Sequence, residues 1–179
     1  MTKSVIIISS SPRKLGNSDL LCDEFAKGAV ANGNKVEKFY VKDMNINYCH
    51  GCGFCFKKTG QCSQKDDMDK VRDKLITADV IVLATPVYFY TMSAQLKTFI
   101  DRCCHFYRSL ANKDFYFIMT AADESKNAMD RVLGEFDGFL ACLDKPKIKG
   151  SVIGTGVWEK GEVIETSFMN EAFELGKTV

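Results

Sequence analysis

The segment "SVIIISSSPRKLGNS", residues 4–18, contains an unbroken apolar run that changes abruptly to hydroxyl, proline and basic residues. Ser4–Ile8 has the continuous β-branched composition of a strand that is covered on both faces. The polar residues after it end in Asn17 and Ser18, a pair that is typical of a helix start, and apolar residues then recur at helical spacing from Leu21 onward. The segment therefore predicts a buried strand, a polar loop and a helix.

The same alternation continues to the end of the chain. Four further β-rich runs predict strands at Lys35–Val41, Asp79–Ala84, Asp114–Thr120 and Lys149–Gly156. Helical periodicity predicts helices at Asp69–Ala78, Met92–Cys103, Ser125–Leu143 and Ile164–Lys177. Five hydrophobic strands separated by helices favour a parallel sheet with helices on both faces. Right-handed crossovers then favour the strand order 2-1-3-4-5 of a flavodoxin-like three-layer α/β/α sandwich.

Composition limits the class of protein. The 179 residues are 46% hydrophobic and 26% charged, which is typical of a soluble globular chain. A net charge of +1, from 24 basic and 23 acidic residues, gives no basic surface for nucleic acid. No apolar run approaches the roughly 20 residues that span a bilayer, and Val5–Ile8 is too short for a signal peptide. We expect one domain over residues 1–179 in the cytoplasm, with neither a membrane nor a nucleic acid as partner.

The expected topology also predicts where a ligand binds. In a doubly wound sheet, ligands bind at the carboxyl ends of the strands, at the point where the strand order reverses. The loops after the first, third and fourth strands should therefore meet at one pocket. A cysteine-rich insertion at about residues 48–63 follows the second strand, so we expect it at the same edge and without regular structure.

The first of these loops, residues 9–18, has the composition of a phosphate site. Backbone N–H groups at a helix N-terminus bind anions, and Arg13 adds a charge-assisted contact. The loop lacks the glycine–lysine pattern of a nucleoside-triphosphate site and the three-glycine pattern of a dinucleotide site. A terminal phosphomonoester suits it best, and the alternative is a serine–asparagine helix cap with nothing bound.

The loop after the third strand carries consecutive aromatic residues. Tyr88, Phe89 and Tyr90 follow Pro86, and three adjacent aromatic side chains cannot all point into the core. They could lie against a planar ligand, or they could cover the sheet edge or a dimer contact.

Three segments together resemble a known family. "SSSPRKLGNS", "TPVYFYTMSAQLKTFIDR" and the cysteine run with "QKDDM" resemble the NADPH-dependent FMN reductase-like branch of the flavodoxin-like superfamily, and within it the iron–sulfur flavoproteins. The likeness extends from Lys3 to about Tyr107, and beyond that only the strand–helix pattern is shared. The sequence departs from the family at Ser10, where glycine is usual, and at "TAADES", which lacks the common glycine.

The resemblance implies that FMN is the bound ligand. It places the phosphate on the first loop, the isoalloxazine ring against the loop after the third strand, and the loop after the fourth strand on the other side of the flavin. The implied residues are Ser11, Arg13, Asn17 and Ser18 for the phosphate; Thr85, Pro86, Val87, Tyr88 and Phe89 for the ring; and Thr120 and Ala121 for the other side.

The cysteine run gives the spacing C-x2-C-x2-C-x6-C, from Cys49, Cys52, Cys55 and Cys62. It resembles the motif that binds a [4Fe-4S] cluster in iron–sulfur flavoproteins, and closely spaced thiolates can reach several corners of one cluster. A structural zinc ion is an alternative, although zinc sites usually combine two separated pairs. Thiols without metal, forming a redox disulfide, are another. The remaining cysteines are expected to be buried small hydrophobic residues: Cys22, Cys103, Cys104 and Cys142.

The expected function is an FMN-binding oxidoreductase, either an NAD(P)H-dependent flavin reductase or an electron-transfer iron–sulfur flavoprotein. NAD(P)H or a ferredoxin-like protein would donate electrons, and a small molecule or a protein would accept them. The cofactor supplies the chemistry, so no side chain is assigned a catalytic role. A homodimer or tetramer would cover the aromatic loop. The alternative is a non-enzymatic module that binds zinc or regulates another protein.

Overall fold

The computed structural model describes residues 1–57 and 61–179. Within these residues, five parallel strands form the sheet in the order β2-β1-β3-β5-β6, and β4 pairs antiparallel with β3. The strands are β1 (Ser4–Ser9), β2 (Lys35–Tyr40), β3 (Val80–Tyr88), β4 (Thr91–Met92), β5 (Asp114–Thr120) and β6 (Lys147–Gly154). The helices are α1 (Asn17–Ala31), α2 (Phe54–Lys57), α3 (Met68–Thr77), α4 (Ala94–Arg102), α5 (Asp130–Leu140) and α6 (Phe168–Lys177).

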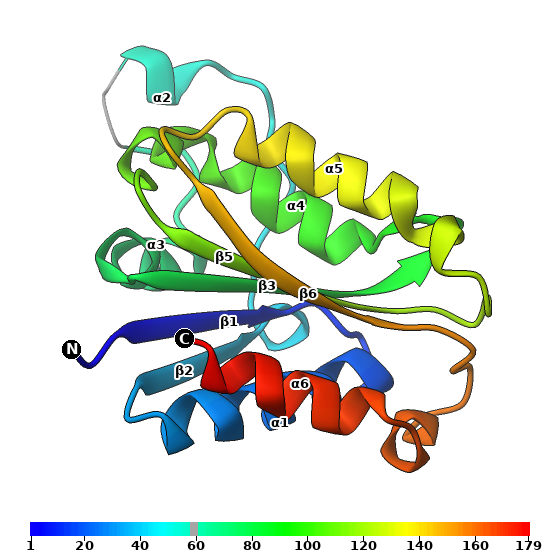
Figure 1. Cartoon of the computed structure of the whole chain (residues 1–179). Coiled ribbons are helices and arrows are strands. Elements are labelled where there is room, and N and C mark those ends of the chain that lie inside the picture. Colours follow the sequence, from blue (N-terminus) through cyan, green and yellow to red (C-terminus); the bar gives the residue numbers. More distant parts are fainter. Residues whose placement is uncertain (58–60) are drawn as a thin grey trace.

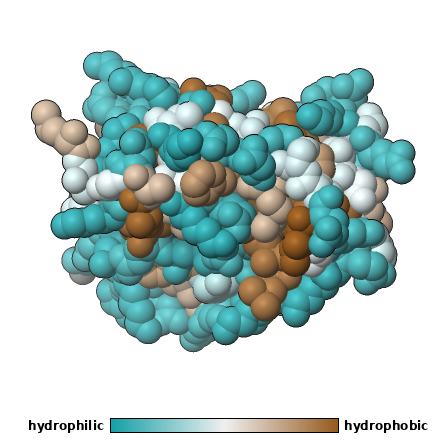
Figure 2. All heavy atoms as spheres, turned by 60° about the horizontal axis from the view of Figure 1, so that its bottom comes forward, coloured by the Kyte–Doolittle hydropathy of each residue, from teal (hydrophilic) through white to brown (hydrophobic). Residues whose placement is uncertain are grey.

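Helices cover both faces of the sheet (Figure 1). Helices α1 and α6 pack on one face over a core that includes Val5, Phe25 and Tyr116. Helices α3, α4 and α5 pack on the other face over a second core, in which the rings of Phe117 and Phe136 stack with centroids 4.2 Å apart. On the α1–α6 side, the surface is mainly hydrophilic and its apolar areas are separated from one another (Figure 2). The continuous apolar strands of the sequence are thus buried between two helical layers.

The expected flavodoxin-like sandwich and its strand order are confirmed, because β2-β1-β3-β5-β6 is the order 2-1-3-4-5 of the predicted strands. The prediction of only five strands was incomplete. Strand β3 continues past Ala84 to Tyr88 and turns back into β4, with Val87 opposite Met92. Strand β4 has only two residues, which is too short to show any periodicity in the sequence.

The segment between β2 and α3 contains more regular structure than expected. A 3-10 turn, η1, covers Val41–Asp43, and α2 forms one helical turn at Phe54–Lys57. Residues 58–60 of the expected insertion at 48–63 lie outside the described residues. Among the helices that the structure describes, none combines the length and the apolar character needed to cross a membrane.

Two glycines allow α1 and α6 to approach closely. A Cβ atom on Gly28 would lie 2.0 Å from the carbonyl oxygen of Phe173, and one on Gly176 would lie 2.1 Å from that of Phe25. Both obstacles are backbone atoms of the facing helix, so a rotamer change cannot relieve them. The position of α6 against α1 therefore depends on the absence of a side chain at both sites.

We predict that Gly176→Ala destabilises the protein by about 1–3 kcal/mol, because the methyl group forces the two helices apart. Gly134 of α5 is the matched control. A Cβ atom there meets nothing within 4 Å, so Gly134→Ala should stabilise the chain by up to roughly 1 kcal/mol through helix propensity. Urea unfolding measures both changes. Equal effects of the two substitutions would contradict this account of the α1–α6 contact.

Candidate functional site

The loop after β1 is tied to β3 and to the start of α4. The Ser10 hydroxyl donates to the Ala84 carbonyl over 2.8 Å, and the Ser93 hydroxyl donates to Ser10 Oγ over 2.9 Å. Ser93 also caps α4 by accepting a hydrogen bond from Leu96 N. Ser10 thus links the first loop to the second. The two loops meet at the carboxyl edge of the sheet, as the topology predicts.

Asp19, in the first turn of α1, stabilises the conformation of this first loop. Its buried carboxylate accepts hydrogen bonds from Leu15 N at 2.9 Å and from Ser9 Oγ and Lys38 Nζ at 3.1 Å. Leu15 adopts a left-handed conformation with φ of 56°, which the bond to Asp19 helps to hold. Burial disfavours the charged form of Lys38, but its hydrogen bond to Asp23 and the charge of Asp19 raise its pKa above the ordinary value. Sequence reasoning missed Asp19, whose place in the first turn of a helix was the available signal.

The first turn of α1 has a polar atom ready for a ligand. Ser18 Oγ is buried and has no hydrogen-bond partner among the described residues. Close by, a Cβ atom on Gly16 would lie 2.7 Å from Ser11 Oγ and 2.9 Å from the Arg13 carbonyl oxygen. The glycine therefore leaves room for a tight loop around the helix N-terminus, where backbone N–H groups favour an anion. A buried unpaired hydroxyl at this position fits a phosphate group.

Asn17 and Arg13, two of the residues predicted to bind the phosphate, also contact residues 157–163 near the C-terminus. The Asn17 amide donates to the Glu159 carbonyl at 2.9 Å and accepts from Gly161 N at 3.0 Å. The Arg13 guanidinium donates to the Trp158 carbonyl at 3.3 Å. Asn17 therefore anchors residues 157–163 with its side chain, and its backbone N–H remains the group suited to a phosphate. This segment was not expected at the site, because nothing in its composition indicates a ligand.

The β3–β4 hairpin presents its aromatic residues under backbone strain. Phe89 and Tyr90 have φ of 51° and 62°, the left-handed values that a two-residue turn of this kind requires and that glycine or asparagine usually supplies. Phe89 is 98% exposed, and Tyr88 is also exposed. The expectation that these rings do not all point into the core is confirmed. Strained, exposed aromatic residues at a strand end are typical of a binding surface.

The other residues expected around the ring lie deeper. Thr85 and Pro86 are buried, and Thr85 Oγ1 accepts a hydrogen bond from Ser93 N at 2.9 Å. Thr120 pairs with Pro86 across the sheet, and Ala121 follows it, so both lie at the same edge. Side chains from the two loops meet where the Tyr90 hydroxyl donates to Asp123 at 3.1 Å. The predicted residues of the three loops are thus brought to one edge of the sheet.

The cysteine loop does not lie at that edge, contrary to expectation. Arg102, the last residue of α4, donates to the Asn47 carbonyl at 2.7 Å and contacts Cys62 Sγ at 3.7 Å. Ser93, which contacts Ser10 of the loop after β1, lies at the other end of the same helix. Nine helical residues separate the two ends by about 13 Å. The chain leaves β2 at the carboxyl edge but returns along α4, so α2 lies on the side where the strands begin (Figure 1).

The four motif cysteines line one small cavity. Its volume is about 110 Å³, and Cys49, Cys52, Cys55 and Cys62 share its wall with Cys104 and the side chains of Arg102 and His105. Arg102 Nε and His105 Nε2 are buried without a partner among the described residues, so the wall can offer polar contacts to an occupant. In the described part of the chain, no three metal-ligating side chains lie close enough to share one ion.

Neighbouring polar side chains contact the sulfur atoms of Cys52 and Cys62. Ser63 Oγ lies 3.3 Å from Cys52 Sγ, and this hydrogen bond lowers the pKa of the Cys52 thiol. Cys62 Sγ accepts from Arg102, whose guanidinium also pairs with Asp66. Burial would raise the pKa of Asp66, but Arg102 holds it below the ordinary value. The loop thus stabilises the thiolate form of Cys52, the form that binds metals.

The expectation for the other cysteines is half correct. Cys22 and Cys103 are buried, and burial raises the pKa of both thiols, so they remain small hydrophobic groups. Cys142 is exposed and Cys104 is half-buried, so the expectation was wrong for these two. The helical periodicity ends near both residues, and the sequence pattern therefore could not show which way they face.

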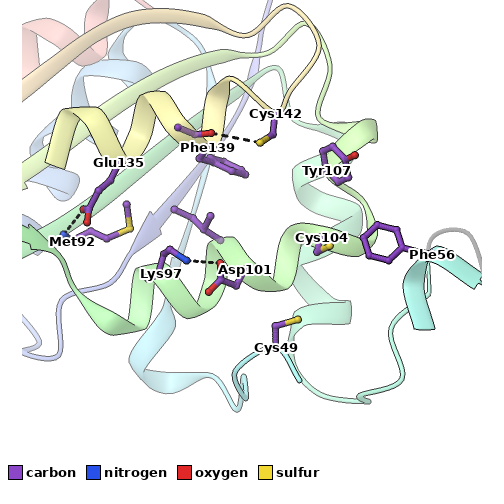
Figure 3. Close-up of a pocket in the computed structure, with 12 residues that line it drawn as sticks. Cys49, Phe56, Met92, Lys97, Asp101, Cys104, Tyr107, Glu135, Phe139 and Cys142 are labelled. Carbon is purple, nitrogen blue, oxygen red and sulfur yellow. Dashed lines mark hydrogen bonds and ion pairs between the residues drawn. The ribbon is translucent and has the colours of Figure 1, made fainter. Parts of the chain in front are cut away.

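A larger apolar hollow of about 800 Å³ adjoins the cysteine cavity (Figure 3). It lies between α4 and α5, with Met92 and Phe139 on its wall, and it shares Cys49, Phe56 and Cys104 with the smaller cavity. The Lys97–Asp101 ion pair lies along α4 at this hollow.

This fold, with its polar loop after β1, aromatic hairpin and cysteine loop, is that of the flavodoxin-like class of protein. Residues 3–143 match the family described as NADPH-dependent FMN reductase, and the chain belongs to that family. An iron-sulfur flavoprotein of Archaeoglobus fulgidus is 45% identical over 95 residues, which are 53% of this chain and 43% of that protein. One of Methanocaldococcus jannaschii is 43% identical over 98 residues, which are 55% of this chain and 50% of that protein.

The chain spans about half the length of these curated relatives. Among solved structures, an NAD(P)H:quinone oxidoreductase from Methanothermobacter marburgensis superposes with a TM-score of 0.73 at 16% identity. The superposition covers 99% of this chain and 96% of that one. At this identity the similarity establishes the fold.

We predict that Phe89→Gly stabilises the ligand-free protein by roughly 1 kcal/mol, because glycine adopts the left-handed backbone without strain. The same change should weaken FMN binding, because it removes the exposed ring. Phe89→Ala is the matched control: it removes the ring but keeps the strain, so it should weaken FMN binding without the gain in stability. Urea unfolding and fluorescence titration with FMN separate the two effects. A Phe89→Gly protein that is no more stable than Phe89→Ala would contradict the strain argument.

Proposed function

We propose that the chain is an FMN-dependent oxidoreductase that takes a hydride from NAD(P)H at the carboxyl edge of its sheet. The observation that carries the proposal is the hydroxyl of Ser18 at the start of α1, buried and without a partner among the described residues, in a chain of the FMN reductase family. A phosphate at a helix N-terminus accepts hydrogen bonds from such a hydroxyl and from the backbone N–H groups around it. These donors favour a ligand that ends in a phosphomonoester, as FMN does.

Different residues at this edge of the sheet would bind the phosphate and the ring of FMN. The hydroxyls of Ser11 and Ser18, the backbone N–H of Asn17 and the charge of Arg13 would hold the phosphate. The hairpin residues Thr85 to Phe89 would line the isoalloxazine ring, with Thr120 and Ala121 on its other side. FMN supplies the chemistry, since it accepts a hydride and releases electrons singly or in pairs. The protein positions FMN and NAD(P)H relative to each other, and no side chain is assigned an acid–base role.

We further propose that the cysteine loop holds a [4Fe-4S] cluster through Cys49, Cys52, Cys55 and Cys62. A single zinc ion needs all its sulfur ligands about 2.3 Å from one point, whereas a cluster takes each thiolate on a different iron. Four thiols line one cavity, and no three ligands in the described part of the chain lie close enough to share one ion, which suits the second arrangement. Such a cluster carries one electron at a time.

The proposed FMN site also suggests the electron donors, the electron acceptors and the oligomeric state. NAD(P)H would donate electrons to the flavin, with a ferredoxin-like protein as the other candidate donor, and a small molecule or a protein would accept them. The exposed rings of Tyr88 and Phe89 support a homodimer or tetramer that covers the hairpin. We propose a cytoplasmic location for the one domain formed by residues 1–179.

The visible spectrum of the anaerobically purified protein tests the proposed function. We expect two resolved flavin bands in the near-ultraviolet and blue, together with broad cluster absorbance that bleaches on reduction. NAD(P)H should bleach the flavin bands. A colourless protein that carries zinc and does not bind added FMN would overturn the proposal and favour a non-enzymatic zinc-binding or regulatory module.

We predict that Ser18→Ala weakens FMN binding about ten- to a hundredfold, because a hydrogen bond to a charged group contributes roughly 1.5–3 kcal/mol. The stability of the ligand-free protein should stay the same or rise, because the hydroxyl has no partner there among the described residues. Ser151→Ala, at an exposed position of β6, is the control and should change neither quantity. Isothermal titration with FMN and with riboflavin gives the test: the loss should appear with FMN and disappear with riboflavin, which lacks the phosphate.

A further inference from the structure

Arg102 joins the end of α4 to both ends of the cysteine loop. Its guanidinium donates to the Asn47 carbonyl at 2.7 Å, two residues before the first cysteine of the motif. It contacts Cys62, the last cysteine, at 3.7 Å. It also forms two hydrogen bonds with Asp66, at 2.6 and 2.9 Å. One side chain therefore holds the segments before and after the motif.

This contact is buried although the loop around it is largely exposed. The side chains of Arg102 and Asp66 are 2% and 3% exposed, whereas Cys49 and Cys52 are exposed. A buried pair with two parallel hydrogen bonds has a fixed geometry, and the loss of either partner leaves an uncompensated charge. Lysine has no planar fork and cannot reproduce this arrangement.

Arg102 also brings charge to the wall of the cysteine cavity. It lines the cavity, its Nε is buried without a partner among the described residues, and one terminal nitrogen faces Cys62 Sγ. Four thiolates and a metal cluster form an anionic unit. Hydrogen bonds to the sulfur atoms and nearby charge are among the factors that set the potential of such a unit.

We propose that Arg102 is the positioning residue of the metal centre: it clamps the cysteine loop to α4 and places a buried positive charge beside the sulfur of Cys62. The clamp is a property of the chain itself, and the effect of the charge rests on the proposed cluster. Reduction of a bound cluster by one electron from dithionite would add one negative charge beside Arg102, with no change of bonds or protons. A neighbouring positive charge stabilises that reduced state and raises the reduction potential.

The clamp is tested first in the metal-free chain by hydrogen exchange. Three amides report on it: Asn45 N bonds to Asp67 at 2.7 Å, Asp67 N to Asn45 at 3.1 Å, and Asn47 N to Asp66 at 3.4 Å. Arg102→Gln should speed the exchange of these amides by about tenfold or more. Arg108→Gln is the control, since Arg108 is exposed and its side chain contacts Tyr107. Where Arg102→Gln does not fold, Asp66→Asn breaks the same pair from its other side.

The second arm uses the protein reconstituted with iron and sulfide. Arg102→Gln should weaken iron retention against a ferrous chelator about 10- to 100-fold, and the cluster that remains should have a more negative midpoint potential. Arg102→Lys keeps the positive charge but loses the planar guanidinium. It should therefore lose iron as readily as Arg102→Gln does, while the midpoint potential of its cluster stays close to that of the unsubstituted protein. Arg108→Gln should change neither.

The outcomes separate this inference from the proposed function. Unchanged exchange and unchanged iron retention in Arg102→Gln, or equal changes in Arg108→Gln, would overturn the clamp. Equal potentials in the glutamine and lysine variants would overturn the role of the charge. If the unsubstituted chain binds no iron, the proposed cluster and the charge role that rests on it both fail, and the exchange of the three amides still decides for or against the clamp.

Discussion

The hydrogen bond between Ser93 and Ser10 fixes the start of α4 against the loop after β1, and both candidate sites depend on that placement. From Ser93 the helix runs back along the sheet and ends in Arg102, which holds the cysteine loop. One helix of nine residues thus sets the distance between the two sites. A shift of α4 would disturb the loop after β1 at one end and the thiols at the other.

Much of the fold could be predicted because burial leaves a direct mark on the sequence. The run Ser4–Ile8 is apolar without interruption because both faces of β1 are covered, and the same holds for the start of β3. The strand order then follows from the handedness of the crossovers. Strand β4 was missed because its pairing depends on a two-residue turn at Phe89 and Tyr90, whose sequence gives none of the usual turn signals.

The site was predictable where it follows from topology and unpredictable where it follows from long-range side-chain contacts. The carboxyl ends of β1, β3 and β5 must meet in a parallel sheet, so the residues proposed to hold the flavin could be grouped in advance. The position of the cysteine loop could not, because it depends on the contact of Arg102 with residues 36 and 55 positions away. Asp19 was missed for a similar reason: its role comes from Leu15, Ser9 and Lys38 together.

The central claim is that one chain holds FMN and a metal cluster at opposite ends of α4. A crystal structure of the protein loaded with FMN and iron, with anomalous scattering measured at the iron edge, tests it most directly. The account predicts the flavin phosphate at Ser18 and an iron peak between the four motif cysteines and Arg102, about one helix length from Ser93. An iron peak in contact with the flavin ring of the same chain, or a flavin phosphate away from Ser18, would contradict it.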